Sequence, residues 1–403
     1  MASDFLRSGK IFDLRVPGFR AAGVSCGIKK NGRKDLAVIV SDSPARVAGV
    51  FTTNSVKAAP VLLDMKRVRK GTASGIIVNS GNANACTGRE GLKNSEAMAA
   101  IAEKALGLRK GSMLVASTGV IGVPLPIKKI ESGMPTVAKM IGYDGLHSAV
   151  EAMMTTDAFP KKTVGKAKIG GSGVTVAGIA KGAGMICPNM ATMLAFFMTD
   201  ANIKSPALSR ALKAAVDRSF NSIIVDNDTS TNDTVLIFAN GSDGNEIKDG
   251  TREFAAFTDL LTSLAVELSH MIVRDGEGAT RFVEIEVAGA ATDEDARLAA
   301  RTVAESMLCK TAFFGGDPNW GRIIAAIGRS GAKMKEERTS ISINGVKVAS
   351  GGLDTGKEKE AARAMKTREL YVKVSLGAGK RSSRVWTSDL TYEYVKINSA
   401  YRT

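Results

Sequence analysis

The sequence predicts an α/β protein built on mixed sheets. Strand-like and helix-like segments alternate along its 403 residues, a pattern typical of chains that pack helices against sheets. Hydrophobic residues make up 44% of the chain, which is enough for a sizeable core. A chain of this length is expected to form two or three lobes, although no Pro/Ser-rich linker marks a boundary between them.

Hydrophobic periodicity supports the elements of the first half. Between residues 94 and 106, Met98, Ile101, Ala102 and Ala105 recur at helical spacing and predict a helix. Short apolar runs predict buried strands at 36–40, 75–78, 113–116 and 174–180.

The second half continues in the same style. Ser205 followed by Pro206 predicts an N-cap and a first helical residue. Thr292 with Asp295 three residues later predicts the start of a helix that runs to residue 308. The Asn-Gly pair at 344–345 predicts a hairpin turn. Further strands are expected at 235–238, 282–287 (half exposed) and 370–374, and a long helix carries Phe257, Leu261, Leu264 and Leu268 in register.

Composition and charge argue against a nucleic-acid-binding protein and against a membrane or secreted protein. Lysine and arginine exceed aspartate and glutamate by 55 to 40, but the basic residues are scattered and aromatics are only 5%. We therefore expect a solvated basic surface rather than a nucleic-acid-binding face. No apolar run has the ~18 residues of a membrane span, and the N-terminus has no run of signal-peptide length, so a cytoplasmic location is expected.

Cysteine and histidine are too sparse for metal or histidine-based chemistry. The cysteines lie far apart without a CxxC pair, so we expect neither a disulfide framework nor a metal site; they are Cys26, Cys86, Cys187 and Cys309. Of the two histidines, His270 lies on a helical pattern and is expected to be an ordinary helix residue. A catalytic base is expected to come from elsewhere.

The run at 181–194 is the most informative stretch of the chain. Thr192 lies between small and apolar residues, after a segment whose glycines and Pro188 prevent a regular helix. Such a threonine is either a structural residue or a self-cleaving nucleophile. If the bond between Ala191 and Thr192 breaks, the Thr192 hydroxyl gains its own α-amine as base, whose pKa of about 7.7–8.0 suits neutral pH.

Five other segments have both a structural and a functional interpretation. The turn expected at 117–122, after a strand, is either an ordinary glycine turn or presents the Thr118 hydroxyl and backbone amides to an oxyanion. The loop at 79–88, which contains Cys86, either binds a ligand or forms surface turns. The stretch at 226–234 fails the calcium-loop pattern and is either a polar network beside an active centre or a surface loop.

The last two segments both contain several glycines. In 274–280, Glu277 either faces a cationic substrate group or is a solvated turn carboxylate. The glycine-rich stretch at 314–322 contains Trp320 and either lines a pocket or forms a packed turn.

Eight segments, taken in order, resemble the ornithine acetyltransferase (glutamate N-acetyltransferase) family of arginine biosynthesis. They are 79–88, 117–122, Thr155-Thr156-Asp157, 181–194, 226–234, 274–280, 315–322 and 398–403. The resemblance implies a layered α-β-β-α arrangement of mixed sheets. It also implies a precursor that cuts itself between Ala191 and Thr192, giving an alpha chain of residues 1–191 and a beta chain of residues 192–403.

The resemblance further implies a ping-pong transfer of acetyl from N2-acetyl-L-ornithine to L-glutamate through acetyl-Thr192. Thr118 and Gly119 would stabilise the oxyanion, Lys181 would hold the substrate carboxylate, and Glu277 would face the amine-bearing end. Thr155, with Thr156 as its rival, and the C-terminal Asn398 and Thr403 would complete the pocket.

By the same resemblance, two alpha and two beta chains assemble into a heterotetramer that needs no cofactor or metal. Whether acetyl-coenzyme A is a co-substrate stays open. Two other functions remain as alternatives: a related self-processing aminopeptidase or amidohydrolase that uses water as acceptor, and a nucleic-acid-binding protein. An amino-acid pocket built from Lys181, Glu277, Asn398 and Thr403 favours the transferase.

Overall fold

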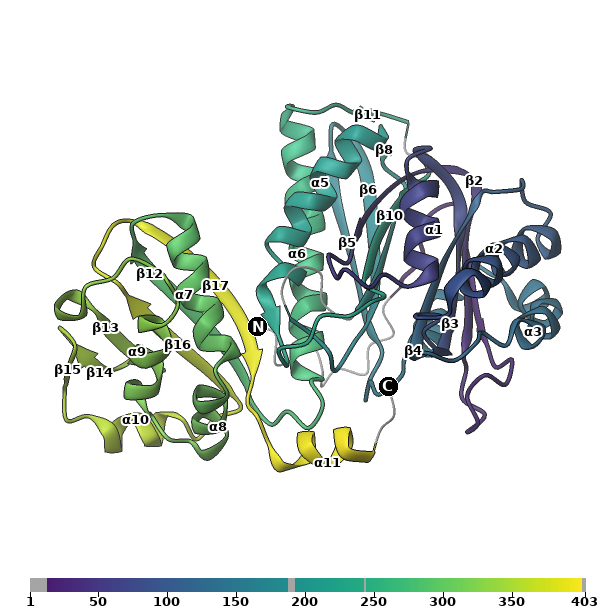
Figure 1. Ribbon diagram of the computed structural model, residues 1–403. Coiled ribbons are helices and arrows are strands. Elements are labelled where there is room, and N and C mark those ends of the chain that lie inside the picture. The colour runs from purple at the N-terminus through teal and green to yellow at the C-terminus, as the bar shows by residue number, and fades with distance from the viewer. Residues whose placement is uncertain (1–12, 188–192, 243, 401–403) are drawn as a thin grey trace.

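A computed structural model describes residues 13–187, 193–242 and 244–400, which form a larger and a smaller lobe (Figure 1). The larger lobe is built on an eight-stranded sheet of order β4-β3-β2-β10-β7-β6-β5, with β1 paired to β2. The smaller lobe is built on a seven-stranded sheet of order β15-β14-β13-β16-β12-β17-β9. The prediction of an α/β protein with mixed sheets and two or three lobes is confirmed.

The elements of the larger lobe are, in chain order, β1 (Phe19–Val24), β2 (Leu36–Phe51), α1 (Ala59–Val68), β3 (Thr72–Asn82), α2 (Gly88–Ala105), β4 (Met113–Val120), α3 (Ile127–Met140), α4 (Leu146–Met153), β5 (Lys161–Ile169), β6 (Ser172–Lys181), β7 (Leu194–Thr199), β8 (Asn202–Ile203), α5 (Ser205–Asp217), the 3-10 turn η2 (Phe220–Ser222), β10 (Thr234–Ala239), β11 (Glu246–Ile247) and α6 (Arg252–Arg274). The short strand β9 (Ile223–Ile224) lies between η2 and β10 in sequence but pairs with the smaller lobe.

The elements of the smaller lobe are β12 (Phe282–Ala290), α7 (Asp293–Glu305), α8 (Met307–Gly315), α9 (Trp320–Gly328), the 3-10 turn η3 (Glu336–Arg338), β13 (Ser340–Ile343), β14 (Val346–Ser350), β15 (Leu353–Asp354), α10 (Glu358–Ala364), β16 (Glu369–Ser375) and β17 (Arg381–Ser388). The last helix, α11 (Tyr392–Ala400), leaves this lobe and returns toward the larger one (Figure 1).

The long strand β2 gives the larger lobe its layers. Its first part pairs with β1 and β3, and its second part pairs with β10. Alternate residues of the two halves of the sheet, such as Ile39 and Phe196, share one inner hydrophobic cluster. The sheet therefore folds into two layers that pack face to face.

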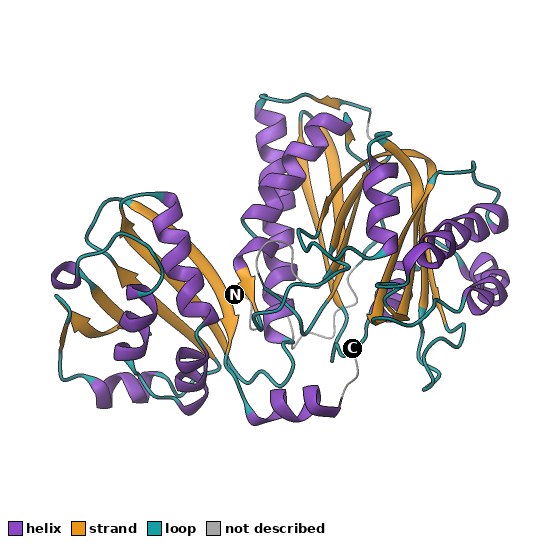
Figure 2. Ribbon diagram, viewed as in Figure 1, coloured by secondary structure: helices purple, strands orange, loops and turns teal. Residues whose placement is uncertain are grey.

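Helices cover both outer faces of these two layers (Figure 2). Val38 and Ile77 pack outward with Met98 of α2 and Val137 of α3. On the opposite face, strand residues such as Phe197 pack with apolar residues of α5 and α6. The predicted α-β-β-α layering is confirmed.

Three expected boundaries differ from the structure. Strand β4 continues to Val120 instead of turning at residue 117, because it pairs with β3 as far as Asn82. Ser205 is the first residue of α5 rather than its N-cap, which is Lys204. The helix opened by Thr292 ends at Glu305, since Ser306 adopts an extended conformation and caps α8.

Helix α6 is long and apolar enough to cross a membrane by length and composition alone. One such helix is weak evidence for a membrane span. Phe257, Leu261, Leu264 and Leu268 instead form its buried face and pack within the core of the larger lobe. We therefore interpret α6 as the core helix that the sequence predicts.

Candidate active site

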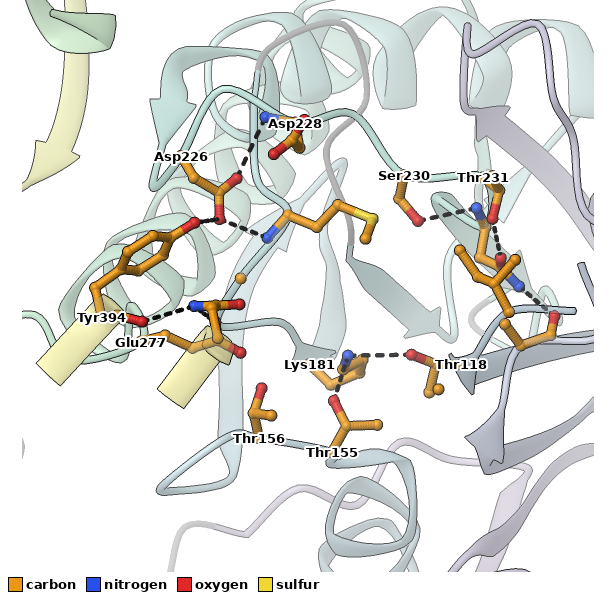
Figure 3. A pocket seen from close by; sticks show the side chains of 17 residues that line it. Thr118, Thr155, Thr156, Lys181, Asp226, Asp228, Ser230, Thr231, Glu277 and Tyr394 are labelled. Carbon is orange, nitrogen blue, oxygen red and sulfur yellow. Dashed lines mark hydrogen bonds between the residues drawn. The ribbon is translucent and has the colours of Figure 1, made fainter. Parts of the chain in front are cut away.

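A pocket of about 190 Å³ lies where both layers of the larger lobe meet α11 (Figure 3). Its walls come from the ends of β4, β6 and α6, the loops at 155–156 and 226–232, and α11. The lining residues are Ala83, Thr118, Gly119, Ile121, Thr155, Thr156, Lys181, Gly184, Met185, Asp226, Asp228, Ser230, Thr231, Asn232, Glu277, Tyr394 and Asn398.

The pocket brings together every predicted site residue that the structure describes. Those residues come from segments far apart in the sequence, and they are Thr118, Gly119, Thr155, Lys181, Glu277 and Asn398. The remaining predictions, Ala191, Thr192 and Thr403, lie outside the described residues.

The chain that follows Thr192 begins beside this pocket. Leu194, the first residue of β7, pairs with Lys181 at the end of β6. The backbone N–H of Met193 donates to Oδ1 of Asp233 over 2.9 Å. Asp233 is buried, and burial raises the pKa of its carboxyl well above the ordinary value, against the opposing effects of the Met193 N–H and Lys181. The start of β7 is thus held in place next to a predicted substrate-binding lysine.

Lys181 is the buried cation of the pocket. Its Nζ donates to Oγ1 of Thr155 over 2.9 Å and to Oγ1 of Thr118 over 3.2 Å. Burial lowers the pKa of Lys181, while the nearby carboxylate of Asp157 opposes that shift. Thr156 also lines the pocket, but the bond to Lys181 is made by Thr155.

Thr118 and Gly119 lie at the end of β4, where the strand pairs with residues 80–82 of β3. Because Lys181 donates to the Thr118 hydroxyl, that hydroxyl keeps its own hydrogen to donate elsewhere. Gly119 has a φ of 133°, and a Cβ at this position would lie 2.4 Å from the carbonyl carbon of Gly81. Only glycine fits this backbone conformation and this close approach.

Carboxylates line the side of the pocket next to α11. Oε2 of Glu277 accepts a hydrogen bond from Nδ2 of Asn398 over 2.9 Å. The Tyr394 hydroxyl donates to Oδ2 of Asp226 over 3.3 Å. Burial raises the pKa of Asp226, whereas the backbone N–H groups of Met185 and Ile186 lower it. The pocket therefore has a cationic end at Lys181 and an anionic side at Glu277 and Asp226.

The stretch at 226–234 forms the polar network that the sequence predicts beside the site. Asn232 Nδ2 donates to the carbonyl oxygens of Ala83 and Ser117 over 2.7 and 2.8 Å. It thereby ties this stretch to the end of β4, next to Thr118. The interpretation as a surface loop is wrong for residues 230–234, which are buried.

The loop at 79–88 lies beside the pocket, with most of its polar side chains buried in the protein. Asn79, Ser80, Asn82 and Asn84 are buried and make hydrogen bonds within the protein, and only Ala83 of this loop lines the pocket. Cys86 is exposed and does not line the pocket, so the structure gives it no part in the site.

Two further candidates lie away from the pocket. The stretch at 314–322 ends α8 and begins α9 in the smaller lobe, where Trp320 lines a different hollow. His270 packs edge-on against the rings of Phe282 and Trp386, with centroid distances of 5.1 and 4.5 Å. It is the ordinary helix residue that the sequence predicts.

Comparison with known proteins adds an observation that covers nearly the whole chain. The model of the ArgJ family matches residues 20–403. The chain belongs to the ArgJ family. The arginine biosynthesis bifunctional protein ArgJ of Geobacter sulfurreducens is 50% identical over 393 residues, which are 97% of this chain and all of that relative.

Two solved structures are similar to parts of this chain. The crystal structure of the arginine biosynthesis bifunctional protein ArgJ of Bacillus halodurans is 40% identical, with a TM-score of 0.50, and covers 51% of this chain and 98% of its own. Ornithine acetyltransferase of Mycobacterium tuberculosis, solved with ornithine, is 38% identical over 44% of this chain and 94% of its own, with a TM-score of 0.39. The resemblance inferred from the sequence is confirmed, and the chain is an acetyltransferase of arginine biosynthesis.

Sequence reasoning missed two parts of this ArgJ-family site. Tyr394 lies four residues before Asn398 on α11, so helical spacing could have found it. Asp233 was part of a predicted network, but its bond to Met193 joins residues 40 positions apart and leaves no local signal. Within the described ranges, no group of three or more metal-binding side chains comes together.

Proposed function

We propose that this chain transfers acetyl from N2-acetyl-L-ornithine to L-glutamate through an acetyl ester on Thr192. The observation that carries the proposal is the meeting of Thr118, Lys181 and Glu277 in one pocket at the start of β7. Membership of the ArgJ family supports the same reaction.

The first half-reaction needs a nucleophile, a base and an oxyanion site. Thr192 Oγ attacks the acetyl carbonyl carbon and gives its proton to the Thr192 α-amine. The carbonyl oxygen becomes an oxyanion that accepts hydrogen bonds from the Thr118 hydroxyl and the Gly119 N–H. The C–N bond then breaks, and the α-ammonium returns the proton to the nitrogen of ornithine as it leaves.

The second half-reaction reverses these roles. The uncharged amine of glutamate attacks the acetyl carbon of the ester, and the Thr192 α-amine removes the surplus proton from its nitrogen. The C–O bond breaks, and Thr192 Oγ recovers a proton. N-acetylglutamate then leaves the pocket.

The polarity of the pocket suits both amino acids. The buried ammonium of Lys181 gives a substrate α-carboxylate a charge-assisted hydrogen bond. In our proposal Glu277 faces the δ-ammonium of acetylornithine, and the hydrogen bond from Asn398 to Glu277 supports this by orienting the carboxylate. Thr155 assists Lys181, and Thr403 completes the pocket in our proposal.

We also propose that the chain cuts itself between Ala191 and Thr192 into alpha (1–191) and beta (192–403) chains. The match to the Bacillus halodurans structure supports this: 98% of that chain aligns with only 51% of this one, as expected if it is one piece of a cleaved relative. We expect a heterotetramer of two alpha and two beta chains in the cytoplasm, without a cofactor. The relatives' description as bifunctional supports acetyl-coenzyme A as a second acetyl donor.

An acetyl-transfer assay tests the proposed function. The purified protein is given N2-acetylornithine with and without glutamate, and ornithine, N-acetylglutamate and acetate are measured. We expect N-acetylglutamate and ornithine in equal amounts, and no product with Thr192→Ala. Acetate formed at the same rate with or without glutamate would instead identify a hydrolase.

A further inference from the structure

Three ionisable side chains lie buried beneath the pocket, and we name them the buried triad: Asp157, Lys161 and Asp275. Lys161 Nζ donates to Oδ1 of Asp157 over 2.7 Å, and neither side chain has exposed surface. Lys161 also pairs with Oδ2 of Asp275, whose side chain is 3% exposed. Buried ion pairs add little net stability, because desolvation offsets the attraction between the charges. The triad instead affects the pocket, because it holds backbone groups of the segments that line it.

Asp157 holds two segments of the pocket through backbone hydrogen bonds. Its Oδ2 accepts the N–H of Thr155 over 2.9 Å, and its Oδ1 accepts the N–H of Gly182 over 2.7 Å. Gly182 directly follows Lys181. One carboxylate therefore fixes the backbone of both residues whose side chains bond to each other inside the pocket.

Asp275 links the triad to the segment of the pocket wall that carries Glu277. It accepts the N–H of Ala158 over 3.1 Å and lies two residues before Glu277, at the C-cap of α6. The N–H of Glu277 itself donates to the carbonyl oxygen of Ala183 over 2.9 Å. The triad thus joins the three segments that carry Thr155, Lys181 and Glu277.

We infer that the buried triad positions the substrate-binding residues Thr155, Lys181 and Glu277 relative to one another. This inference rests on the proposed acetyl transfer. Asp157 is a positioning residue, since it acts through the groups that line the pocket and does not itself line it.

The charges around Lys181 give Asp157 an effect on pH dependence. Burial lowers the pKa of Lys181, and Asp157 is the largest influence that raises it. Removing the Asp157 charge lowers the pKa of Lys181 further, so Lys181 loses its proton at a lower pH. The other charged groups around Lys181 are Lys161, Glu277, Asp233 and Lys29.

Asp157→Asn is the variant that tests the inference, and Glu103→Gln is its matched control. Glu103 is also a buried carboxylate that pairs with a cation, Arg67, and accepts a backbone N–H, that of Met113 over 2.9 Å. It lies by the opposite end of β4 from Thr118, outside the pocket. Both variants lose one buried charge, so a general loss of stability affects them alike.

The measurements are kcat and KM for N2-acetylornithine from pH 6 to 10, with melting temperatures and the cleaved fraction determined for each protein. For Asp157→Asn we expect KM to rise on the order of tenfold, because the groups that bind the substrate are misplaced. We also expect the increase of KM at alkaline pH to begin at a lower pH than in the wild type. For Glu103→Gln we expect wild-type KM and a wild-type pH profile. Asp157→Glu restores the charge and is expected to recover the wild-type pH profile.

The outcomes separate this inference from the proposed function. A wild-type protein without acetyl transfer overturns the proposed function. If the wild type is active but Asp157→Asn has the same KM and pH profile as Glu103→Gln, the role of the triad is overturned. If Asp157→Asn does not fold, Asp275→Asn replaces it: a raised KM supports the inference, and a wild-type KM overturns it.

Discussion

Lys181 shows how a single side chain prepares the pocket for an anion. It is 3% exposed, and its hydrogen bonds to Thr118 and Thr155 go to uncharged hydroxyls. A buried ammonium is costly unless a charge compensates it. The nearby carboxylate of Asp157 compensates the charge in part, and the proposed substrate carboxylate would add a negative charge bonded directly to the ammonium.

Thr118 permits a direct test of the oxyanion site. Thr118→Val keeps the shape of the side chain but removes the hydroxyl that donates to the developing oxyanion. We expect kcat to fall by about 10²–10³ for acetyl transfer, the usual effect of losing one such donor. The measurement is kcat on protein that is shown to be cleaved, so that uncut precursor does not account for a lower rate.

The control for this variant is Thr156→Val, which removes a hydroxyl that lines the same pocket. We expect it to change kcat much less, since the oxyanion role is assigned to Thr118. Equal losses in the two variants would refute that assignment.

At the residue scale, the sequence predicted most of the pocket because motifs carry chemistry in their residue types. Thr118, Lys181 and Glu277 were found in this way and lie together. The contacts behind them were not found, because they join residues far apart in the sequence: Asp275 is 114 positions from Lys161 and 117 positions from Ala158. Such pairs leave no periodic signal in the chain.

At the element scale, periodicity predicted the strands and helices whose faces are clearly divided. Strand β12 alternates buried Val283 and Ile285 with half-buried Glu284, and Asn344 and the glycine after it both have positive φ in the predicted hairpin. Errors arose where tertiary pairing decides the boundary. Strand β4 runs past its expected turn because β3 lies beside it, and no local pattern reports that neighbour.

Helix α6 joins the two lobes through His270, which packs against Phe282 of β12 and Trp386 of β17. Burial, with Arg274 and Arg384 nearby, lowers the pKa of His270 to about 4 from its ordinary value of 6.5. Between these two values the unfolded chain binds a proton that the folded chain does not. His270 therefore makes the folded state less stable as pH falls from 6.5 toward 4.

His270→Phe tests this linkage, because phenylalanine fills the space but cannot take up a proton. We expect the two proteins to have similar melting temperatures at pH 7.5, and the wild type to lose more than the variant at pH 5. Differential scanning calorimetry at the two pH values measures this difference. An equal loss in both proteins would show that His270 does not contribute to acid sensitivity.

At the scale of the whole molecule, the proposed cleavage falls within one sheet. Strand β6 ends at Lys181, and β7 begins at Leu194 as its antiparallel neighbour. Strand β7 also pairs with β10, and β10 pairs with β2 from the first part of the chain. The two chains would therefore share a hydrogen-bonded sheet and a common core, and we expect them to stay together after the bond between them is broken.

The layered fold would hold the start of β7 in place after the proposed cut. The start of β7 is held by Asp233 through the Met193 N–H and by its pairing with β6 and β10, none of which requires a bond to residue 191. The pocket receives residues from both proposed chains: Thr118 and Lys181 from the first, Glu277 and Asn398 from the second. Neither chain alone would form the site.

Intact mass spectrometry with N-terminal sequencing, made on the purified protein under denaturing conditions, tests the central claim most directly. We predict two chains that elute together under native conditions, the second beginning Thr192-Met193-Leu194, and a single inactive chain for Thr192→Ala. A wild-type protein that transfers acetyl groups at full rate as one uncut chain of 403 residues would contradict the account.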